Sequence, residues 1–145
     1  MTVKIVIGLD GEDTGERALT FAKDLASRIK GCELIAIYVI EWSPFTFQTP
    51  EENARRHKRR EEEIELAMTR IVTPAVKSLQ DAGFIASGIV RHGDVAETLN
   101  ALTVENGGSQ IIVGRASSGG FSTRIFGSST QNLVMNADVP VTVVG

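Results

Sequence analysis

Five short runs of β-branched and apolar residues, each separated from the next by a helical pattern, constrain this chain more than any other feature. Nearly every position of the first run is apolar, which is typical of a strand that is covered on both faces. Strands that alternate with helices favour an α/β fold with a parallel sheet and helices on both of its faces. The predicted strands are residues 4–9, 33–40, 85–91, 111–113 and 139–144.

The helices between these runs are predicted from their start signals and their buried faces. In several places Ser, Thr or Asp stands three residues before Glu or Gln, which is the spacing of a capping box. The pairs are Asp13 with Glu16, Thr49 with Glu52, Asp94 with Glu97 and Ser128 with Gln131. Gly31 is expected to cap the end of the first helix. Buried faces are predicted at Ala18, Ala22, Leu25, Ala26 and Ile29 and at Leu99, Leu102 and Val104, and the last helix start leads into Leu133, Val134 and Ala137.

The helix that follows Thr49 is highly charged in its first half, residues 51–63, and gains an apolar face only from Ile64 onward. We expect this half to project into solvent or to face a partner. Lys58 with Glu62 and Arg59 with Glu63 have the spacing of helical ion pairs, which favours a solvated, self-paired face over an anion or partner patch at 55–60. Pro74 is expected to kink or break this helix.

Length and charge bound the function classes. At 145 residues the chain is long enough for a single domain over residues 1–145 and too short for two. A formal net charge of -3 argues against a general nucleic-acid binder. Neither a signal-peptide pattern nor a run long enough to cross a membrane is present, so we expect a cytoplasmic protein without membrane contacts. Cys32 has no second cysteine and is expected to be a structural thiol.

The segment over residues 114–129 is rich in glycine and hydroxyl side chains and carries two arginines. It follows an apolar run and ends at a helix start, where free backbone N–H groups form a site for phosphate in open α/β sheets. It lacks the Gly-Lys-Ser or Gly-Lys-Thr of a Walker A loop, and the first strand lacks the Gly-x-Gly-x-x-Gly of dinucleotide binders. Composition alone leaves an anion site and a merely flexible loop open.

Asp10 stands at the carboxyl end of the first predicted strand. A carboxylate at this position can hydrogen-bond a base edge or a ribose hydroxyl, or it can simply start a turn with Gly11. No acid directly beside it completes a magnesium pocket. His57 and His92 are isolated in the sequence, and no serine has a histidine and an acid placed by a known motif. The sequence therefore predicts no catalytic residue and no protein metal site.

The spacing within this segment resembles the motif of the universal stress protein family, in which Gly-x-x-Gly is followed after nine residues by Gly and then Ser or Thr. Residues 114–117 are followed here by nine residues and then by Gly127 and Ser128. The segments 4–10, 37–41 and 136–144 are also similar to that family, so the resemblance spans the chain. Ser117 departs from it, because the motif has its second glycine there.

The resemblance implies a Rossmann-like, open sheet of five parallel strands in the order 3-2-1-4-5, a homodimer formed through residues 139–144 and, in one branch of the family, an ATP site. Carried over by position, Asp10 and Val39 would meet the adenine and ribose. If residue 117 needs a positive φ or a close phosphate approach, serine is unfavourable; if only its N–H is needed, serine suffices. The ribose and phosphates would be lined by Gly114, Ser117, Gly127, Ser128 and Ser129, and the expected binding residues also include Leu9, Val113 and Arg115.

Two functions follow from the resemblance. The first is a cytoplasmic, dimeric regulatory protein of the stress response that binds ATP, with or without Mg²⁺, and is not an enzyme, any hydrolysis being slow. The second is a dimeric stress protein that binds no nucleotide and acts through protein contacts. Ser117 is the residue that separates them. The stress signal and the protein partner are not indicated by the sequence.

Overall fold

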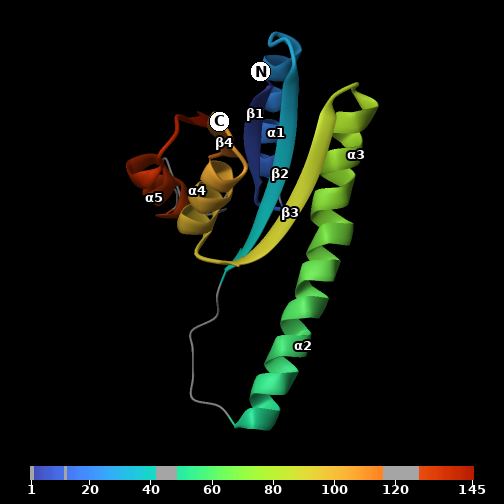
Figure 1. Ribbon diagram of the computed structural model, residues 1–145, viewed down its shortest axis with the longest axis vertical. Coiled ribbons are helices and arrows are strands. Elements are labelled where there is room, and N and C mark those ends of the chain that lie inside the picture. Colours follow the sequence, from blue (N-terminus) through green and yellow to red (C-terminus); the bar gives the residue numbers. More distant parts are fainter. Residues whose placement is uncertain (1, 12, 42–48, 116–127) are drawn as a thin grey trace.

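The computed structural model describes residues 2–11, 13–41, 49–115 and 128–145 (Figure 1). Strands and helices alternate along these ranges, as the sequence predicts, and the label η1 denotes a π-helical turn. None of the helices in these ranges combines the length and the apolar composition that a membrane span requires. In chain order the elements are β1 (Val3–Leu9), α1 (Asp13–Ser27), β2 (Cys32–Glu41), α2 (Pro50–Ala67), η1 (Met68–Val72), α3 (Thr73–Asp81), β3 (Ile85–Gly93), α4 (Val95–Glu105), β4 (Gln110–Gly114), α5 (Ser128–Asn136) and β5 (Val141–Val144).

The five strands form one parallel sheet in the order β3-β2-β1-β4-β5, which confirms the predicted fold class and strand order. β1 lies at the centre, between β2 and β4. Its residues Ile5, Val6 and Ile7 are completely buried. The unbroken apolar run of β1 therefore reflects a strand that is covered on both faces and paired on both edges.

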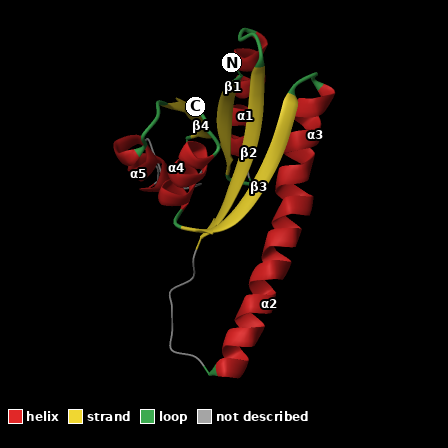
Figure 2. Cartoon of the chain, viewed as in Figure 1, coloured by secondary structure: helices red, strands yellow, loops and turns green. Residues whose placement is uncertain are grey.

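Helices cover both faces of the sheet (Figure 2). Successive side chains of a strand point to opposite faces, so β1 contributes Ile5 and Ile7 to one core and Val6 to the other. The first core is completed by α1 and α3, through Ala18, Ala22, Ala26 and Leu79. The second is completed by α4 and α5, through Ala96, Leu99, Leu102 and Leu133.

Two of the predicted helix starts are confirmed. The Thr49 hydroxyl accepts a hydrogen bond from the Glu52 N–H, and the Glu52 carboxylate accepts one from the Thr49 N–H, each at 3.2 Å. This is a complete capping box at the start of α2. At the start of α4, the Asp94 carboxylate accepts a hydrogen bond from the Glu97 N–H at 3.0 Å.

The other two predicted caps are wrong. α1 already includes Asp13 and α5 already includes Ser128, so both residues lie in the first turn rather than ahead of it. In α1 the Gly15 N–H donates instead to Asp10, which precedes the helix. The sequence signal is ambiguous because any acceptor a few residues ahead of a helix can reach a free N–H of its first turn.

α2 extends beyond the sheet as an arm, residues 50–63 (Figure 1). Almost all of its residues are exposed, and the first buried residue of α2 is Ala67. Ala67 and Val72 pack against Val90 of β3, with Ile64 and Met68 beside them. This confirms that the polar half of the helix projects away from the core.

A π-helical turn interrupts the α-helix just before Pro74, which is the predicted break rather than a kink. In η1 the Thr73 N–H donates to the carbonyl of Met68, five residues back. In a regular α-helix the proline ring would clash with the carbonyl four residues earlier, that of Arg70. The π-helical turn therefore relieves this clash, and α3 continues in nearly the same direction (Figure 1).

The predicted end of α1 and the predicted start of β5 are wrong. α1 ends at Ser27 rather than next to Gly31, because the Ile29 N–H closes a tighter turn on the Ala26 carbonyl at 3.1 Å. Gly31, at φ 73°, then turns the chain into β2. β5 starts at Val141 rather than at residue 139, since Pro140 has no N–H to donate to a neighbouring strand.

Val104, which the sequence predicts to be buried, is exposed, and so is Val134 of α5. Val104 is 54% and Val134 is 48% exposed. In each helix the preceding residue, Thr103 or Leu133, takes the inward position. Thr103 can do so despite its hydroxyl because that group donates to the Leu99 carbonyl at 2.7 Å.

Cys32 is half-buried at the start of β2. Its thiol lies 3.7 Å from the carbonyl oxygen of Glu33. Burial, and then the neighbouring Glu33 carboxylate, raise the pKa of the Cys32 thiol. A thiol reacts as the thiolate, so this environment agrees with the predicted structural role.

Gly88 of β3 occupies a position with almost no room for a side chain. A Cβ there would overlap Val72 Cγ1 and lie 3.0 Å from Val76 Cγ2. We expect Gly88→Ala to lower the free energy of unfolding by about 1–3 kcal/mol, because the helix must shift off the sheet. Ser87→Ala, at the exposed neighbouring position, should change it by less than about 0.5 kcal/mol. Urea denaturation would compare the two, and equal stabilities would contradict this packing.

Candidate functional site

The carboxyl ends of β1 and β4 lie side by side at one edge of the sheet. Gly8 pairs with Val113, so the chain after Gly8 runs beside the chain after Val113. β4 is held on its other side as far as Arg115, whose N–H donates to the Val144 carbonyl at 2.8 Å. Open α/β sheets bind ligands outside the carboxyl ends of their strands, where the strand order reverses. We therefore take this edge as the candidate site.

Asp10 is exposed at this edge, directly after β1. Its Oδ1 accepts a hydrogen bond from the Gly15 N–H at 3.0 Å, in the first turn of α1, where the backbone has no acceptor within the helix. A Cβ on residue 15 would lie 2.8 Å from Oδ1, so glycine permits this approach. Gly11, at φ 78°, forms the turn that the sequence allowed. α1 therefore holds the Asp10 carboxylate at the sheet edge.

The predicted apolar residues of the site lie on opposite faces of the sheet. Val39 and Val113 are each 7% exposed and belong to the core on the α4–α5 side. Leu9 packs on the α1–α3 side. Leu9 pairs with Tyr38 of β2. Val39 follows Tyr38 and therefore lies level with Asp10, which follows Leu9. Val39, Val113 and Asp10 are thus brought to one edge, and Leu9 faces the other way.

The remaining predicted residues divide between described and undescribed parts of the chain. Gly114 is half-buried at the end of β4, and Arg115 is exposed after it. Ser128 and Ser129, in the first turn of α5, are exposed and half-buried respectively. The predictions for Ser117 and Gly127 lie outside the described residues.

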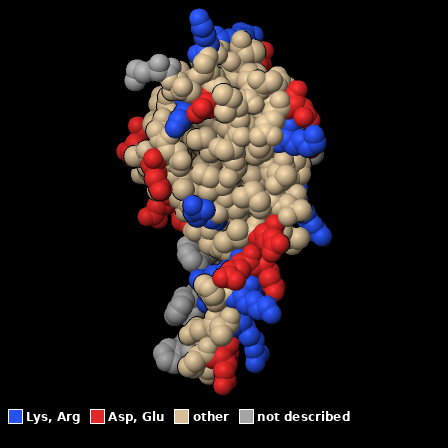
Figure 3. All heavy atoms as spheres, turned by 45° about the vertical axis from the view of Figure 1, so that its right-hand side comes forward, with Lys and Arg blue, Asp and Glu red and all other residues tan. Residues whose placement is uncertain are grey.

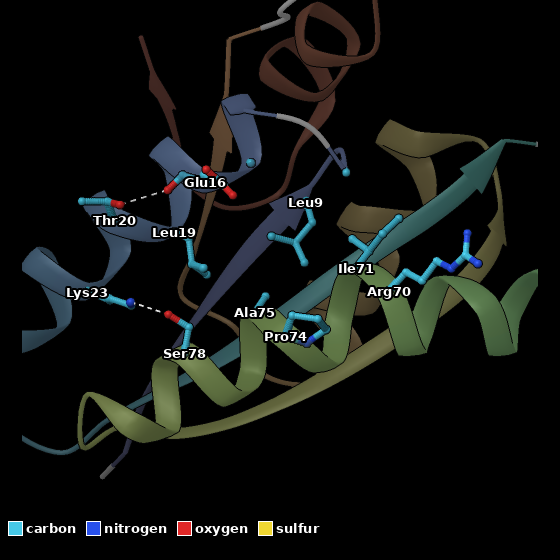
Figure 4. Close-up of a pocket in the computed structure, with 12 residues that line it drawn as sticks. Leu9, Glu16, Leu19, Thr20, Lys23, Arg70, Ile71, Pro74, Ala75 and Ser78 are labelled. Atoms are coloured by element: carbon cyan, nitrogen blue, oxygen red, sulfur yellow. Dashed lines mark hydrogen bonds between the residues drawn. The ribbon is translucent and has the colours of Figure 1, made fainter.

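A groove of about 440 Å³ opens on the α1–α3 side, and sequence reasoning missed it (Figure 4). Lys23 of α1 donates to the Ser78 hydroxyl of α3 and bridges the groove at one end. Of the predicted site residues that the structure describes, Leu9 alone lines it. Its walls are otherwise Gly11, Gly15, Glu16, Leu19, Thr20, Lys23, Arg70, Ile71, Pro74, Ala75 and Ser78.

A second unpredicted contact joins the arm to the sheet. The His92 Nε2 at the end of β3 lies 3.0 Å from Glu63 Oε2, and the His92 side chain is only 9% exposed. The prediction that His92 is isolated is therefore wrong. Glu63 was expected to pair with Arg59, and only the fold brings it to a residue 29 positions away.

The described residues contain no group of three or more His, Cys, Asp or Glu side chains placed to hold a metal ion.

The universal stress protein family matches the sequence over residues 1–145. The chain belongs to this family. The match covers β1 to β5 and includes both sides of the candidate site. No curated protein sequence matches the chain significantly.

Solved structures of universal stress proteins share the fold. UspA from Lactobacillus plantarum has a TM-score of 0.81 at 20% identity, covering 99% of this chain and 97% of that one. A universal stress protein solved in complex with cAMP has a TM-score of 0.68 at 19% identity, covering 99% and 96%. The Archaeoglobus fulgidus universal stress protein in complex with dAMP has a TM-score of 0.63 at 20% identity, covering 99% and 98%.

Removing the Asp10 carboxylate should lower stability even without a ligand. Asp10→Ala leaves the Gly15 N–H without its acceptor, and we expect the free energy of unfolding to fall by about 1 kcal/mol, as for a lost helix cap. Asp10→Asn keeps a side-chain oxygen in place and should cost less than about 0.5 kcal/mol. Urea denaturation at pH 7 measures both variants. Equal losses would show that the hydrogen-bond acceptor is not what stabilises α1.

Proposed function

We propose that this universal stress protein binds an adenine nucleotide, ATP in particular, at the carboxyl ends of β1 and β4 and acts as a cytoplasmic regulatory protein rather than an enzyme. The observation that carries the proposal is the Asp10 carboxylate, which α1 holds beside the adjoining ends of these strands. A carboxylate fixed in this way is a ready acceptor for ribose hydroxyl groups.

The residues present fit such a ligand. Asp10 offers oxygen acceptors to a ribose, and the apolar side chains of Val39 and Val113 lie at the same edge. Arg115 offers a guanidinium to phosphate oxygens. The first turn of α5, with the hydroxyls of Ser128 and Ser129, offers further donors. The roles of Ser117 and Gly127 stay predictions.

Relatives support the choice of an adenine nucleotide. One universal stress protein with this fold was solved with cAMP and another with dAMP. These ligands share an adenine base and a ribose-derived sugar with ATP, and they differ from ATP in their phosphates. We propose that Mg²⁺, where it takes part, is held chiefly by the phosphates, since the described residues form no cluster of three metal-ligating side chains.

We also propose that the protein is a homodimer formed through residues 139–144. β5 ends the sheet and pairs with β4 on one side, and no described strand lies on its other side. Val141, Val143 and the other residues of β5 are only half-buried in the single chain. An edge strand with half-buried apolar side chains is a suitable surface for a second copy.

Nucleotide binding should depend on the charge of Asp10. Asp10→Asn keeps the acceptor for Gly15 but removes the negative charge, and we expect ATP affinity to fall by about tenfold or more, the usual cost of losing a hydrogen bond to a charged group. Asp81→Asn, at the end of α3, is the control and should bind as the wild type does. Isothermal titration calorimetry with ATP measures the affinities.

A rise in melting temperature with added ATP provides an independent measure of binding. No heat and no thermal shift at millimolar ATP would contradict the proposal. That outcome would favour a universal stress protein that acts through protein contacts without a nucleotide.

The dimer proposal predicts that a charge in β5 lowers the mass in solution. Val143→Lys should convert a dimer to a monomer, because a lysine would be buried against the second copy without a partner. Ile85→Lys in β3, at the opposite edge and 69% exposed, is the control. Light scattering after gel filtration gives the mass, circular dichroism checks the fold, and Val141→Lys serves as a second variant. Folded variants that stay dimeric would contradict the interface.

A further inference from the structure

A stripe of exposed polar residues runs along the arm and continues into η1. Its members alternate between spacings of four and three residues, which keeps them on one side of a helix. All of them are exposed. The members of this arm stripe are Glu51, Arg55, Lys58, Glu62, Glu65 and Thr69.

The arm stripe faces away from the sheet. Ile64, Ala67 and Met68 are the residues of the same helix that pack toward Val90 of β3. At 3.6 residues per turn, the arm stripe lies roughly 150° around the helix from these three residues. A partner that contacts the arm stripe therefore approaches from the side opposite the sheet.

The charged side chains of the arm stripe are not used within the described part of the chain. There, Glu51, Arg55, Lys58, Glu62 and Glu65 make no side-chain hydrogen bond or ion pair. Other charged residues of α2 do have partners: His57 lies 3.1 Å from Glu61, and Glu63 lies 3.0 Å from His92. The predicted pair of Lys58 with Glu62 is not formed.

When two copies of the arm stripe are laid antiparallel, opposite charges meet. Glu51 is acidic, Arg55 and Lys58 are basic, and Glu62 and Glu65 are acidic again. Figure 3 shows that basic and acidic side chains occupy successive zones along the arm as a whole. If the two antiparallel copies are centred on position 60, residue 55 of one copy lies opposite residue 65 of the other, and residue 58 lies opposite residue 62. Both contacts join opposite charges, and two-fold symmetry makes each of them twice.

We propose that the arm stripe is a self-association surface on which the arm of a second copy lies antiparallel, with the two-fold axis beside position 60. The pairing forms Arg55–Glu65 and Lys58–Glu62 contacts in both directions, and Glu51 meets the neutral Thr69. The alternation of four-residue and three-residue spacings suits two helices that cross at a small angle. Because each arm stripe faces away from its own sheet, the two sheets lie on the outside of the pair.

A second copy fits this surface better than a charged polymer or a membrane does. An anionic surface that followed the arm stripe past Arg55 and Lys58 would meet Glu62 and Glu65 on one side and Glu51 on the other. Like-charged groups at these contacts would oppose binding. An antiparallel second copy instead presents acidic residues to Arg55 and Lys58 and basic residues to Glu62 and Glu65.

This association should be weak and sensitive to salt. Exposed ion pairs contribute little individually and are screened by added salt, so we expect a dissociation constant on the order of 0.1–1 mM at low ionic strength. The arm lies at the β3 edge of the sheet, whereas the dimer proposed above uses β5 at the opposite edge. The arm contact is independent of nucleotide, and it would join β5 dimers into larger species.

Charge reversal in the full-length protein tests the proposal. An acidic variant carries Arg55→Glu with Lys58→Glu, and a basic variant carries Glu62→Lys with Glu65→Lys. Neither should associate with itself through the arm stripe, because every contact then joins like charges. An equimolar mixture restores opposite charges at all four contacts, so the two variants should associate with each other.

Sedimentation velocity at 20 mM and 500 mM NaCl, up to millimolar protein, measures the association, and circular dichroism checks that the arm stays helical. In 500 mM NaCl the contact between arms is screened, so the mass there reports only the association through β5. The expected result is a further, salt-sensitive increase for the wild type and for the mixture but not for either variant alone. The proposal is overturned if the wild type shows no salt-sensitive association, if both variants keep it, or if the mixture does not regain it.

Discussion

The burial of β1 on both faces and along both edges is the constraint on which the rest of the structure depends. β2 and β4 pair with its edges, while α1 and α4 cover its faces. Gly8 shows how close this packing is, since a Cβ there would lie 2.8 Å from Val113 Cγ1 and 3.1 Å from Leu99 Cδ1. From Ile5 to Leu9 this enclosed strand carries no polar side chain. Asp10 is the first residue beyond that point, and the candidate site follows from its position.

The contact between Asp10 and Gly15 gives one carboxylate two roles. It satisfies a backbone N–H at the start of α1, and it stays exposed at the edge of the sheet. A group already held by the protein loses little conformational freedom when a ligand binds, so its contribution to affinity is not offset by the cost of ordering it. The structural role of Asp10 and its proposed role in ligand binding thus do not compete, and conservative variants of Asp10 can separate them.

Sequence reasoning predicted the parts of the fold that depend on local patterns. The strand order came from the family resemblance, and the strands from apolar runs such as that of β1. The capping box at Thr49 and the irregularity before Pro74 were also found, because each depends on residues within one or two turns. Helix ends are predicted less accurately, since the sequence indicates Gly31 as a cap whereas the tighter turn at Ile29 ends α1 first. In the candidate site, Asp10 was found, but its contact with Gly15 was not.

Contacts between distant segments could not be predicted from spacing. His92 and Glu63 are 29 positions apart, and the sequence offers Glu63 nearer basic partners. The same limit applies to the groove between α1 and α3, whose residues come from three separate segments. The sequence also could not show that Leu9 faces away from Val39, because that depends on the register in which β1 and β2 pair.

The arm shows how a helix with a charged, exposed first half can remain ordered. Such a segment has no apolar face to bury, so its order must come from its ends and from individual polar contacts. The capping box at Thr49 closes one end, and the Glu63–His92 contact joins the other to β3. His92 pairs with Ile40 near the carboxyl ends of β3 and β2, at the same edge of the sheet as Asp10. The arm is therefore attached to the edge that carries the candidate site, while its outer charges contribute nothing to that attachment. Their order matches that of an antiparallel second copy, the partner proposed for this surface.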